Sequence, residues 1–257
     1  MNMRWYIIKT ITDIRILSMA LFQKYKKAQS KGVCAVIVAA GSGSRMGCTD
    51  TSKIMLELLG KPVISYTLRA YEAAQSIDSI VVVARQEDMM LITDIAREFG
   101  ISKLKSVVAG GATRSESVEN GLAALPSTTG YVAIADGARP LITPEIINNT
   151  VAQAIKVGGA AAAIPIRDTL KRVSDGKITQ TVDRTSLYAV QTPQVFDVIK
   201  YRAARSVATA KEYTDDTMYF EDAGFAVAVT EGSASNIKIT YKEDIALAES
   251  ILEKRGY

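Results

Sequence analysis

The sequence predicts an α/β fold in which a mostly parallel sheet carries helices on both faces. Two observations support this prediction. Short apolar runs rich in Val, Ile and Ala alternate with longer amphipathic segments from residue 33 to about residue 166. The apolar runs are also continuous, as expected for strands that are buried on both faces. Strands that alternate with helices in this way form parallel sheets with crossover helices.

The elements follow from this alternation in chain order. We expect five strands, at residues 33–40, 78–84, 104–110, 130–136 and 160–166. We expect four helices between them, at residues 61–75, 87–100, 115–125 and 143–159. Thr143 is the expected N-cap of the last helix, since Pro144 follows at its first helical position and glycines lie at its end.

The pattern changes from Arg167 onward. Residues 167–184 predict a hairpin with Asp175 and Gly176 as its turn, because Asp-Gly suits a tight two-residue turn. Beyond it we expect a helix around residues 199–209, strands at 224–232 and 236–240, and a closing helix at 241–255. The simplest arrangement is one α/β domain, residues 33–257, with a protruding arm at about 166–190.

Residues 1–32 form a basic extension. They hold seven Lys or Arg residues and one Asp, whereas the whole chain has a net charge of +4, so the rest of the chain is slightly acidic. A near-neutral body argues against nucleic-acid binding. Apolar residues at helical spacing predict an accessory helix outside the catalytic fold: Ile11, Ile14, Leu17 and Leu21. Asp13 and Arg15 interrupt that stretch, which argues against a signal peptide and against a transmembrane segment.

Composition excludes several kinds of chemistry. The chain has no histidine, which excludes His-based triads and His general bases. Its two cysteines, Cys34 and Cys48, are too few for a disulfide framework and lack metal-site spacing. Both facts suit a cytoplasmic protein whose chemistry uses Lys, Arg, Asp, hydroxyl groups and backbone amides.

A glycine-rich loop follows the first predicted strand, in the stretch VIVAAGSGSRMG at residues 36–47. The dinucleotide fingerprint fails because Met46 stands where its third glycine belongs, and the Gly-Lys-Ser/Thr of a P-loop is absent. A phosphate-binding loop remains, with Arg45 inside it and Lys53 shortly after. An ordinary strand–helix turn with two surface cations is the alternative.

Further polar residues follow other predicted strands. Asp136 ends the fourth strand, where it could bind a divalent metal or a ribose hydroxyl, and Arg139 could bind a phosphate. Later segments supply Arg167, Asp168, Thr169, Lys171, Asp183, Arg184, Thr192 and Lys238. Each could be an ordinary surface residue. Together they provide cations and hydroxyls without a nucleophile–base pair, which suits phosphate chemistry catalysed by electrostatics.

Nine segments in this order closely resemble the 2-C-methyl-D-erythritol 4-phosphate cytidylyltransferases of the non-mevalonate isoprenoid pathway: AVIVAAGSGSRMG, SKIMLELLGKPVISYTL, AGGATRSESVENGL, DGARP, PIRDTLKR, TVDR, QTPQVF, YTDDT and SNIKIT. The resemblance covers roughly residues 33–254. It implies a Rossmann-like nucleotidyltransferase fold, a homodimer with exchanged β-arms and a Mg²⁺-dependent reaction. In that reaction the phosphate of methylerythritol phosphate attacks the α-phosphorus of CTP, and pyrophosphate leaves.

The resemblance also assigns site residues. Catalytic roles fall to Arg45, Lys53, Arg184 and Lys238. Nucleotide contacts fall to Ala39, Ala40, Gly41, Gly111, Ser117 and Asp136, with Asp136 also near the metal. Substrate contacts fall to Arg139, Thr169, Thr192 and Thr214. The arm would carry Thr169 and Arg184 into the neighbouring subunit's site.

The sequence departs from the family pattern in the segments SKIM and ADGARP and at Ala112, and the basic extension has no family counterpart. Two other functions remain open. Ribitol-5-phosphate cytidylyltransferase has the same fold and reaction, although it typically has Ala-Gly-Gly at positions 39–41 and Ser-Val-Arg-Pro at 137–140. The other is a catalytically silent nucleotide-binding protein that uses the extension for interactions.

Overall fold

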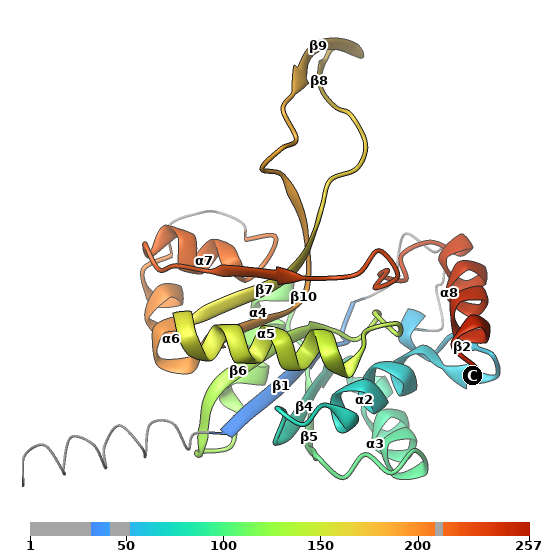
Figure 1. Ribbon diagram of the computed structural model, residues 1–257. Coiled ribbons are helices and arrows are strands. Elements are labelled where there is room, and N and C mark those ends of the chain that lie inside the picture. The colour runs from blue at the N-terminus through green and yellow to red at the C-terminus, as the bar shows by residue number, and fades with distance from the viewer. Residues whose placement is uncertain (1–31, 42–51, 209–212) are drawn as a thin grey trace, which may run out of the picture.

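The computed structural model describes residues 32–41, 52–208 and 213–257. The predicted extension, residues 1–32, lies outside them except for its last residue. A seven-stranded sheet runs through the molecule in the order β11-β7-β10-β6-β1-β4-β5 (Figure 1). Its strands are β1 (Gly32–Val38), β4 (Ser79–Ala84), β5 (Leu104–Ala109), β6 (Thr129–Asp136), β7 (Gly159–Pro165), β10 (Tyr188–Asp197) and β11 (Ala228–Glu231).

The sheet is mostly parallel, as the sequence predicts. Strand β1 pairs in parallel with β4 and β6, β4 with β5, and β7 with β11. Only β10 runs antiparallel to its neighbours β6 and β7 among these strands. The chain moves from β1 outward to β4 and β5, and then crosses to the other side of β1 to form β6. The carboxyl ends of β1 and β6 therefore meet at a switch point, where open α/β sheets bind ligands.

Helices cover both faces of the sheet, again as predicted. Their bounds are α2 (Val63–Ala73), α3 (Met89–Glu98), α4 (Arg114–Ala123), α5 (Pro144–Val157), α6 (Val198–Ser206), α7 (Thr217–Asp222) and α8 (Glu243–Lys254). Helices α2, α3, α5 and α8 pack on one core, and α4, α6 and α7 pack on the other. Successive β1 residues alternate between the two cores, as the continuous apolar run requires: Cys34 and Val36 face one, and Ala35 and Ile37 the other.

The fourth predicted helix shows how local signals set its ends. Pro144 occupies the first turn of α5, and Gly158 ends it in the left-handed conformation, with φ of 107°. Both agree with the prediction. Thr143 stands at the N-cap with extended backbone, but its side chain makes no capping hydrogen bond.

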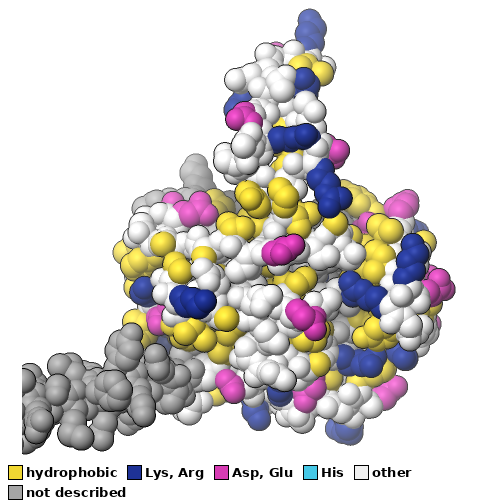
Figure 2. Space-filling view, viewed as in Figure 1, with side chains coloured by type: hydrophobic (Ala, Val, Ile, Leu, Met, Phe, Trp, Pro, Cys, Tyr) yellow, Lys and Arg dark blue, Asp and Glu magenta, His cyan; other side chains and the backbone are white. Residues whose placement is uncertain are grey.

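The arm is a hairpin that projects away from the body of the molecule (Figure 1). Strands β8 (Leu170–Ser174) and β9 (Lys177–Val182) pair antiparallel around Asp175 and Gly176, whose φ angles are 50° and 73°. Two positive φ values match the mirror-image turn that Asp-Gly favours. Figure 2 shows the arm carrying basic side chains clear of the body. The hairpin is therefore confirmed, whereas its role in dimerisation stays a prediction.

One predicted strand is wrong. Residues 236–240 run as irregular chain between β11 and α8. Their backbone groups bond to single partners instead of a neighbouring strand: Ile239 N donates to Ala138 O at 2.8 Å, and Thr240 N donates to Asp244 Oδ2 at 2.7 Å. The alternating apolar residues arise because Ile239 is buried in the core that α2, α3, α5 and α8 cover, and Ile237 packs against the same core.

Smaller differences concern element ends. The strand expected at 224–232 shortens to β11, because Gly224 (φ of 72°) ends the preceding turn and only four residues reach β7. Helix α7 was not predicted, since six residues are too few for a clear helical period. The short elements Lys53–Met55, Glu57–Leu58, Lys61–Pro62 and Gln86–Asp88 complete the described secondary structure. Among the described residues, no helix is long and apolar enough to cross a membrane.

Candidate active site

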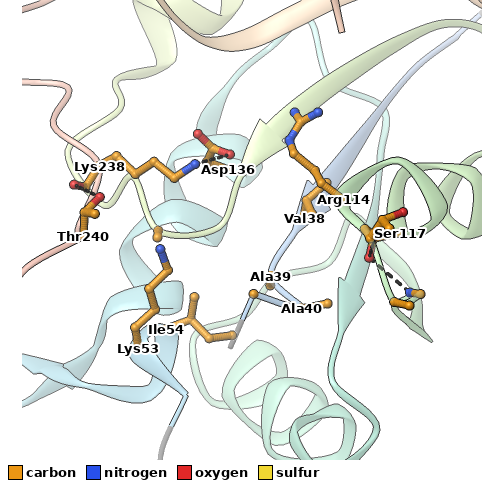
Figure 3. Close-up of a pocket in the computed structure, with 15 residues that line it drawn as sticks. Val38, Ala39, Ala40, Lys53, Ile54, Arg114, Ser117, Asp136, Lys238 and Thr240 are labelled. Carbon is orange, nitrogen blue, oxygen red and sulfur yellow. Dashed lines mark hydrogen bonds and ion pairs between the residues drawn. The ribbon is translucent and has the colours of Figure 1, made fainter. Parts of the chain in front are cut away.

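A pocket of about 390 Å³ opens at the switch point, beside the carboxyl ends of β1 and β6 (Figure 3). Three stretches and two isolated residues form most of its wall: residues 38–41, Lys53 with Ile54, residues 111–114, Asp136 and Lys238. Ser117, Ala138 and Thr240 complete it. Small residues and backbone line one side, and charged side chains line the other.

The small side of the pocket depends on close approach between two loops. A Cβ atom at Gly110 would lie 2.4 Å from the Cβ of Ala40, and one at Gly111 would lie 2.3 Å from the Cβ of Glu116. Neither distance is compatible with a side chain. The glycine pair therefore lets residues 39–41 and the start of α4 lie side by side.

The start of α4 is held by a set of capping hydrogen bonds. Thr113 Oγ1 accepts from Glu116 N at 3.1 Å, and Glu116 Oε2 accepts from Ala112 N at 2.7 Å. Ser117 Oγ accepts from Gly111 N at 3.1 Å and donates to Thr113 O at 2.9 Å. These bonds resemble a capping box and fix the glycine loop against the helix.

Asp136 is the electrostatic centre of the charged side. It is 9% exposed, and its two oxygens are held by different cations: Lys238 Nζ lies 3.1 Å from Oδ1 and Arg139 Nε 3.0 Å from Oδ2. Burial alone would raise the pKa of Asp136, but Lys238, Arg139 and Arg114 lower it below its usual value. The carboxylate is therefore ionised at neutral pH.

Buried amide groups hold these charges in place. Arg139 Nη1 donates to Asn236 O at 2.7 Å, and Asn236 Nδ2 donates to Thr192 O at 3.1 Å. Thr192 Oγ1 in turn accepts from the backbone N–H of Asp136 at 3.1 Å. The irregular segment 236–240 thus brings Lys238 beside Asp136, and Lys53 Nζ donates to Ile239 O of the same segment at 3.1 Å.

The two segments that depart from the family pattern, ADGARP and SKIM, both contribute residues to the pocket wall. Gly137, in the ADGARP segment, donates from its N–H to Val38 O at 2.8 Å, and its carbonyl accepts from Thr67 Oγ1 at 3.0 Å. In the SKIM segment, Ser52 and Ile54 are buried on either side of Lys53. Ser52 O accepts from Met55 N at 2.8 Å, whereas the buried Ser52 Oγ has no hydrogen-bond partner among the described residues.

The structure brings together most of the residues assigned from the sequence. Those that line the pocket are Ala39, Ala40, Gly41, Lys53, Gly111, Ser117, Asp136 and Lys238. Arg139 and Thr192 contact Asp136 from behind the wall. Thr169 and Arg184 are exposed on the arm, away from the pocket of their own chain. Thr214 is exposed, with Oγ1 bonded to Met218 Sδ at 3.4 Å, and Arg45 lies outside the described residues.

Arg114 lines the pocket although sequence reasoning gave it no role. Its Nη2 lies 2.6 Å from Oδ2 of Asp216, a residue that is 102 positions away in the sequence. The available signal was an arginine at the start of a helix directly after a glycine loop. Its partner could not be found without the tertiary structure.

Comparisons with known proteins agree with this architecture. The family model described as 2-C-methyl-D-erythritol 4-phosphate cytidylyltransferase matches residues 33–254. A relative of that name from Thermosynechococcus vestitus is 43% identical over 223 residues, which are 86% of this chain and 95% of the relative. Another from Pelotomaculum thermopropionicum is 43% identical over 227 residues, or 87% of this chain and 95% of the relative.

Solved structures show the same fold. A 4-diphosphocytidyl-2C-methyl-D-erythritol synthase from Anaerococcus prevotii superposes with a TM-score of 0.76 at 33% identity, covering 87% of this chain and 99% of that one. The 2-C-methyl-D-erythritol 4-phosphate cytidylyltransferase from Thermus thermophilus gives 0.68 at 26% identity, covering 85% and 98%. With its fold, the ordered motifs and the extent of these matches, the chain belongs to the 2-C-methyl-D-erythritol 4-phosphate cytidylyltransferase family.

Proposed function

We propose that this protein transfers CMP from CTP to 2-C-methyl-D-erythritol 4-phosphate, a step of non-mevalonate isoprenoid precursor biosynthesis. The observation that carries the proposal is the pocket itself, in which a wall of small residues and backbone faces Lys53, Asp136 and Lys238. The names of the relatives support this acceptor, and ribitol 5-phosphate has no comparable support.

The reaction needs no general base. A phosphate monoester is already anionic at neutral pH, so one of its oxygens can attack the α-phosphorus of CTP directly. As that bond forms, the bond between the α-phosphorus and the bridging oxygen breaks, and pyrophosphate leaves with the electron pair. The absence of histidine is therefore compatible with catalysis.

The main barrier is repulsion between two anions. Lys238 and Arg139 are held beside Asp136 by ion pairs, and Lys53 is held against the same segment. Cations fixed in this way need little reorganisation when charge moves onto the leaving group, and such groups typically lower a barrier by roughly 3–4 kcal/mol each. We assign Lys238, with Arg184 of a partner's arm, to the attacking phosphate, and Lys53, with Arg45, to the triphosphate.

The nucleotide would occupy the small side of the pocket. Ala39, Ala40 and Gly41 leave space beside the glycine loop, where the base and ribose can approach the backbone. Gly111 and Ser117 are fixed there by their mutual hydrogen bond of 3.1 Å. We assign substrate contacts to Arg139 and Thr192, which contact Asp136, and to Thr214.

The donor set suits Mg²⁺. Asp136 offers an ionised carboxylate oxygen of the kind that Mg²⁺ prefers, and the described residues contain no cluster of three His, Cys, Asp or Glu that could hold a metal by itself. A Mg²⁺ ion bound at Asp136 would therefore complete its shell with phosphate oxygens and water. When bound, it would neutralise phosphate charge.

We also infer a cytoplasmic homodimer with exchanged arms. Val173 and Ile178 are exposed apolar residues on the arm, which suits contact with a second subunit. Thr169 and Arg184 are exposed there as well, so a partner's pocket can receive them. The cytoplasm is favoured by the low cysteine content, since Cys34 is a buried free thiol.

The test is product identity. Purified protein is incubated with CTP, Mg²⁺ and either methylerythritol phosphate or ribitol 5-phosphate, while pyrophosphate release is followed and products are identified by mass spectrometry. We expect CDP-methylerythritol and faster turnover of methylerythritol phosphate. Faster turnover of ribitol 5-phosphate would assign the other acceptor, and CTP binding without pyrophosphate release from either would indicate a silent nucleotide-binding protein.

A further inference from the structure

Arg114 belongs both to the pocket and to a buried polar cluster behind it. It is the first residue of α4, and its side chain is 29% exposed in the pocket wall. Its guanidinium is bound to Asp216, whose side chain is only 1% exposed. Figure 3 shows this guanidinium pointing away from Ala39 and Ala40.

Asp216 also connects two further elements. Its Oδ1 accepts from the hydroxyl of Tyr201 on α6 at 2.5 Å, and its backbone N–H donates to Gln194 Oε1 on β10 at 2.8 Å. Gln194 stands two residues after Thr192, which accepts the hydrogen bond from Asp136 N. The segment 213–217 is thus connected through Asp216 to both the glycine-loop side and the Asp136 side of the pocket.

Arg114 is the cation that balances this buried carboxylate. Burial alone would lower the pKa of Arg114, but Asp216 raises it above its usual value, with a smaller contribution from Asp136. Tyr201 supplies only a neutral hydroxyl, since burial and Asp216 raise its pKa well above the usual value. Removing one partner of a buried pair leaves an uncompensated charge. Loss of Arg114 from the pocket wall would leave the buried charge of Asp216 uncompensated behind that wall, which would disfavour binding of an anion in the pocket.

We propose that Arg114 is a positioning residue that, through Asp216, fixes the segment 213–217 and sets the pocket's affinity for the acceptor phosphate. The inference rests on the proposed function. The acceptor is assigned because the segment 213–217 includes Thr214, which is assigned to the substrate above, and because the Arg114 guanidinium points away from Ala39 and Ala40 (Figure 3). The charge of Arg114 is neutralised by Asp216, so Arg114 acts on the pocket through Asp216.

A double-mutant cycle tests the inference. Arg114→Met, Asp216→Asn and the double variant are compared for kcat, for KM of methylerythritol phosphate, and for CTP affinity by calorimetry. We expect Arg114→Met to raise KM for the acceptor at least about tenfold, with kcat and CTP affinity within about threefold of wild type. The double variant should recover most of that loss, because the unbalanced carboxylate is gone.

Hydrogen exchange supplies a readout that does not need turnover. Amides of residues 213–217 should exchange at least about tenfold faster in Arg114→Met and return toward wild type in the double variant. Arg97→Met is the matched control, because Arg97 forms an exposed ion pair with Asp94 on α3, with side chains 76% and 60% exposed. The control should change none of these measurements.

Several results would overturn the inference. These are additive effects in the cycle, a parallel change in acceptor KM and CTP affinity, or unchanged exchange in residues 213–217. A lowered melting temperature with unchanged KM would likewise reduce Arg114 to a structural residue. Wild-type protein that makes no product would overturn the proposed function instead. Product formation by wild type with an unchanged KM in Arg114→Met would overturn this inference alone.

Discussion

Asp136 shows how one buried carboxylate organises its neighbours. Its two oxygens bind Lys238 and Arg139, and its backbone N–H binds Thr192. A buried carboxylate is tolerated only when such partners replace water. The same arrangement holds two cations next to the space where phosphates must meet, so stability and function here depend on the same contacts.

Asp136→Asn should abolish most turnover and also weaken CTP binding, because Asp136 is assigned both to the nucleotide and to the metal. The substitution removes the negative charge that holds Lys238 and Arg139 in place and that suits a divalent metal. We expect kcat to fall by about 10²–10³-fold, as for other losses of preorganised electrostatic groups. Pyrophosphate release and CTP calorimetry measure the two effects. Glu231→Gln, an exposed change on β11, is the control, and near-normal turnover of Asp136→Asn would contradict the role.

Two glycines of the nucleotide wall should respond differently to alanine. At Gly110 the added Cβ would lie 2.4 Å from the Cβ of Ala40, whereas at Gly41 no atom of the described residues lies within 4 Å of an added Cβ. Gly110→Ala should therefore lower the free energy of unfolding by about 1–3 kcal/mol, and Gly41→Ala should change it by less than about 0.5 kcal/mol. Urea denaturation compares them, and equal losses would show that the close approach is unimportant.

At the scale of elements, the exposed apolar side chains of the arm are not accounted for by the described part of its own chain. Hairpin β8–β9 stands clear of the body (Figure 1). Its Val173 and Ile178 side chains are exposed. An isolated two-stranded hairpin is marginally stable in water. A second subunit that covers the arm would account for these exposed groups.

Exchange of arms can be tested by complementation. Arg184→Ala removes a cation from the arm, and Lys238→Ala removes one from the pocket, so each homodimer should be nearly inactive. A 1:1 mixture refolded or expressed together should regain about a quarter of wild-type activity, since half of the dimers are mixed and one site in each is intact. As the control, the two folded homodimers are mixed under conditions in which their subunits do not exchange. No recovery in verified mixed dimers would show that the arm does not serve the partner's pocket.

At the scale of the whole molecule, the match to the family begins at the first strand. The family match starts at residue 33, and β1 starts at Gly32. Removal of residues 1–31 should therefore leave kcat/KM within about twofold of the full chain, because the pocket and both cores lie in the remaining residues. Steady-state kinetics of the two proteins measure this. A folded but inactive truncation, with circular dichroism unchanged, would assign the extension a role in catalysis.

Local pattern was sufficient to predict most of the fold. Continuous apolar runs identified the parallel strands, because a strand buried on both faces has no polar side, and Asp175-Gly176 identified the hairpin because its turn needs two positive φ angles. Residues 236–240 misled the prediction. Their alternation arises because Ile237 and Ile239 both pack on the hydrophobic core, and burial produces the same pattern whether or not a neighbouring strand is present.

The sequence by itself therefore determined the α/β class, the order of most elements and the residues beside β1 and β6 that line the pocket. Those residues follow strand ends, and parallel strands bring their carboxyl ends to one edge. Only the tertiary structure decided which charges are paired. Lys238 meets Asp136 and Arg114 meets Asp216 across 102 positions in each case, and such contacts depend on how the sheet and loops pack. Ion pairing between distant segments has no period in the sequence, because it is created by the fold.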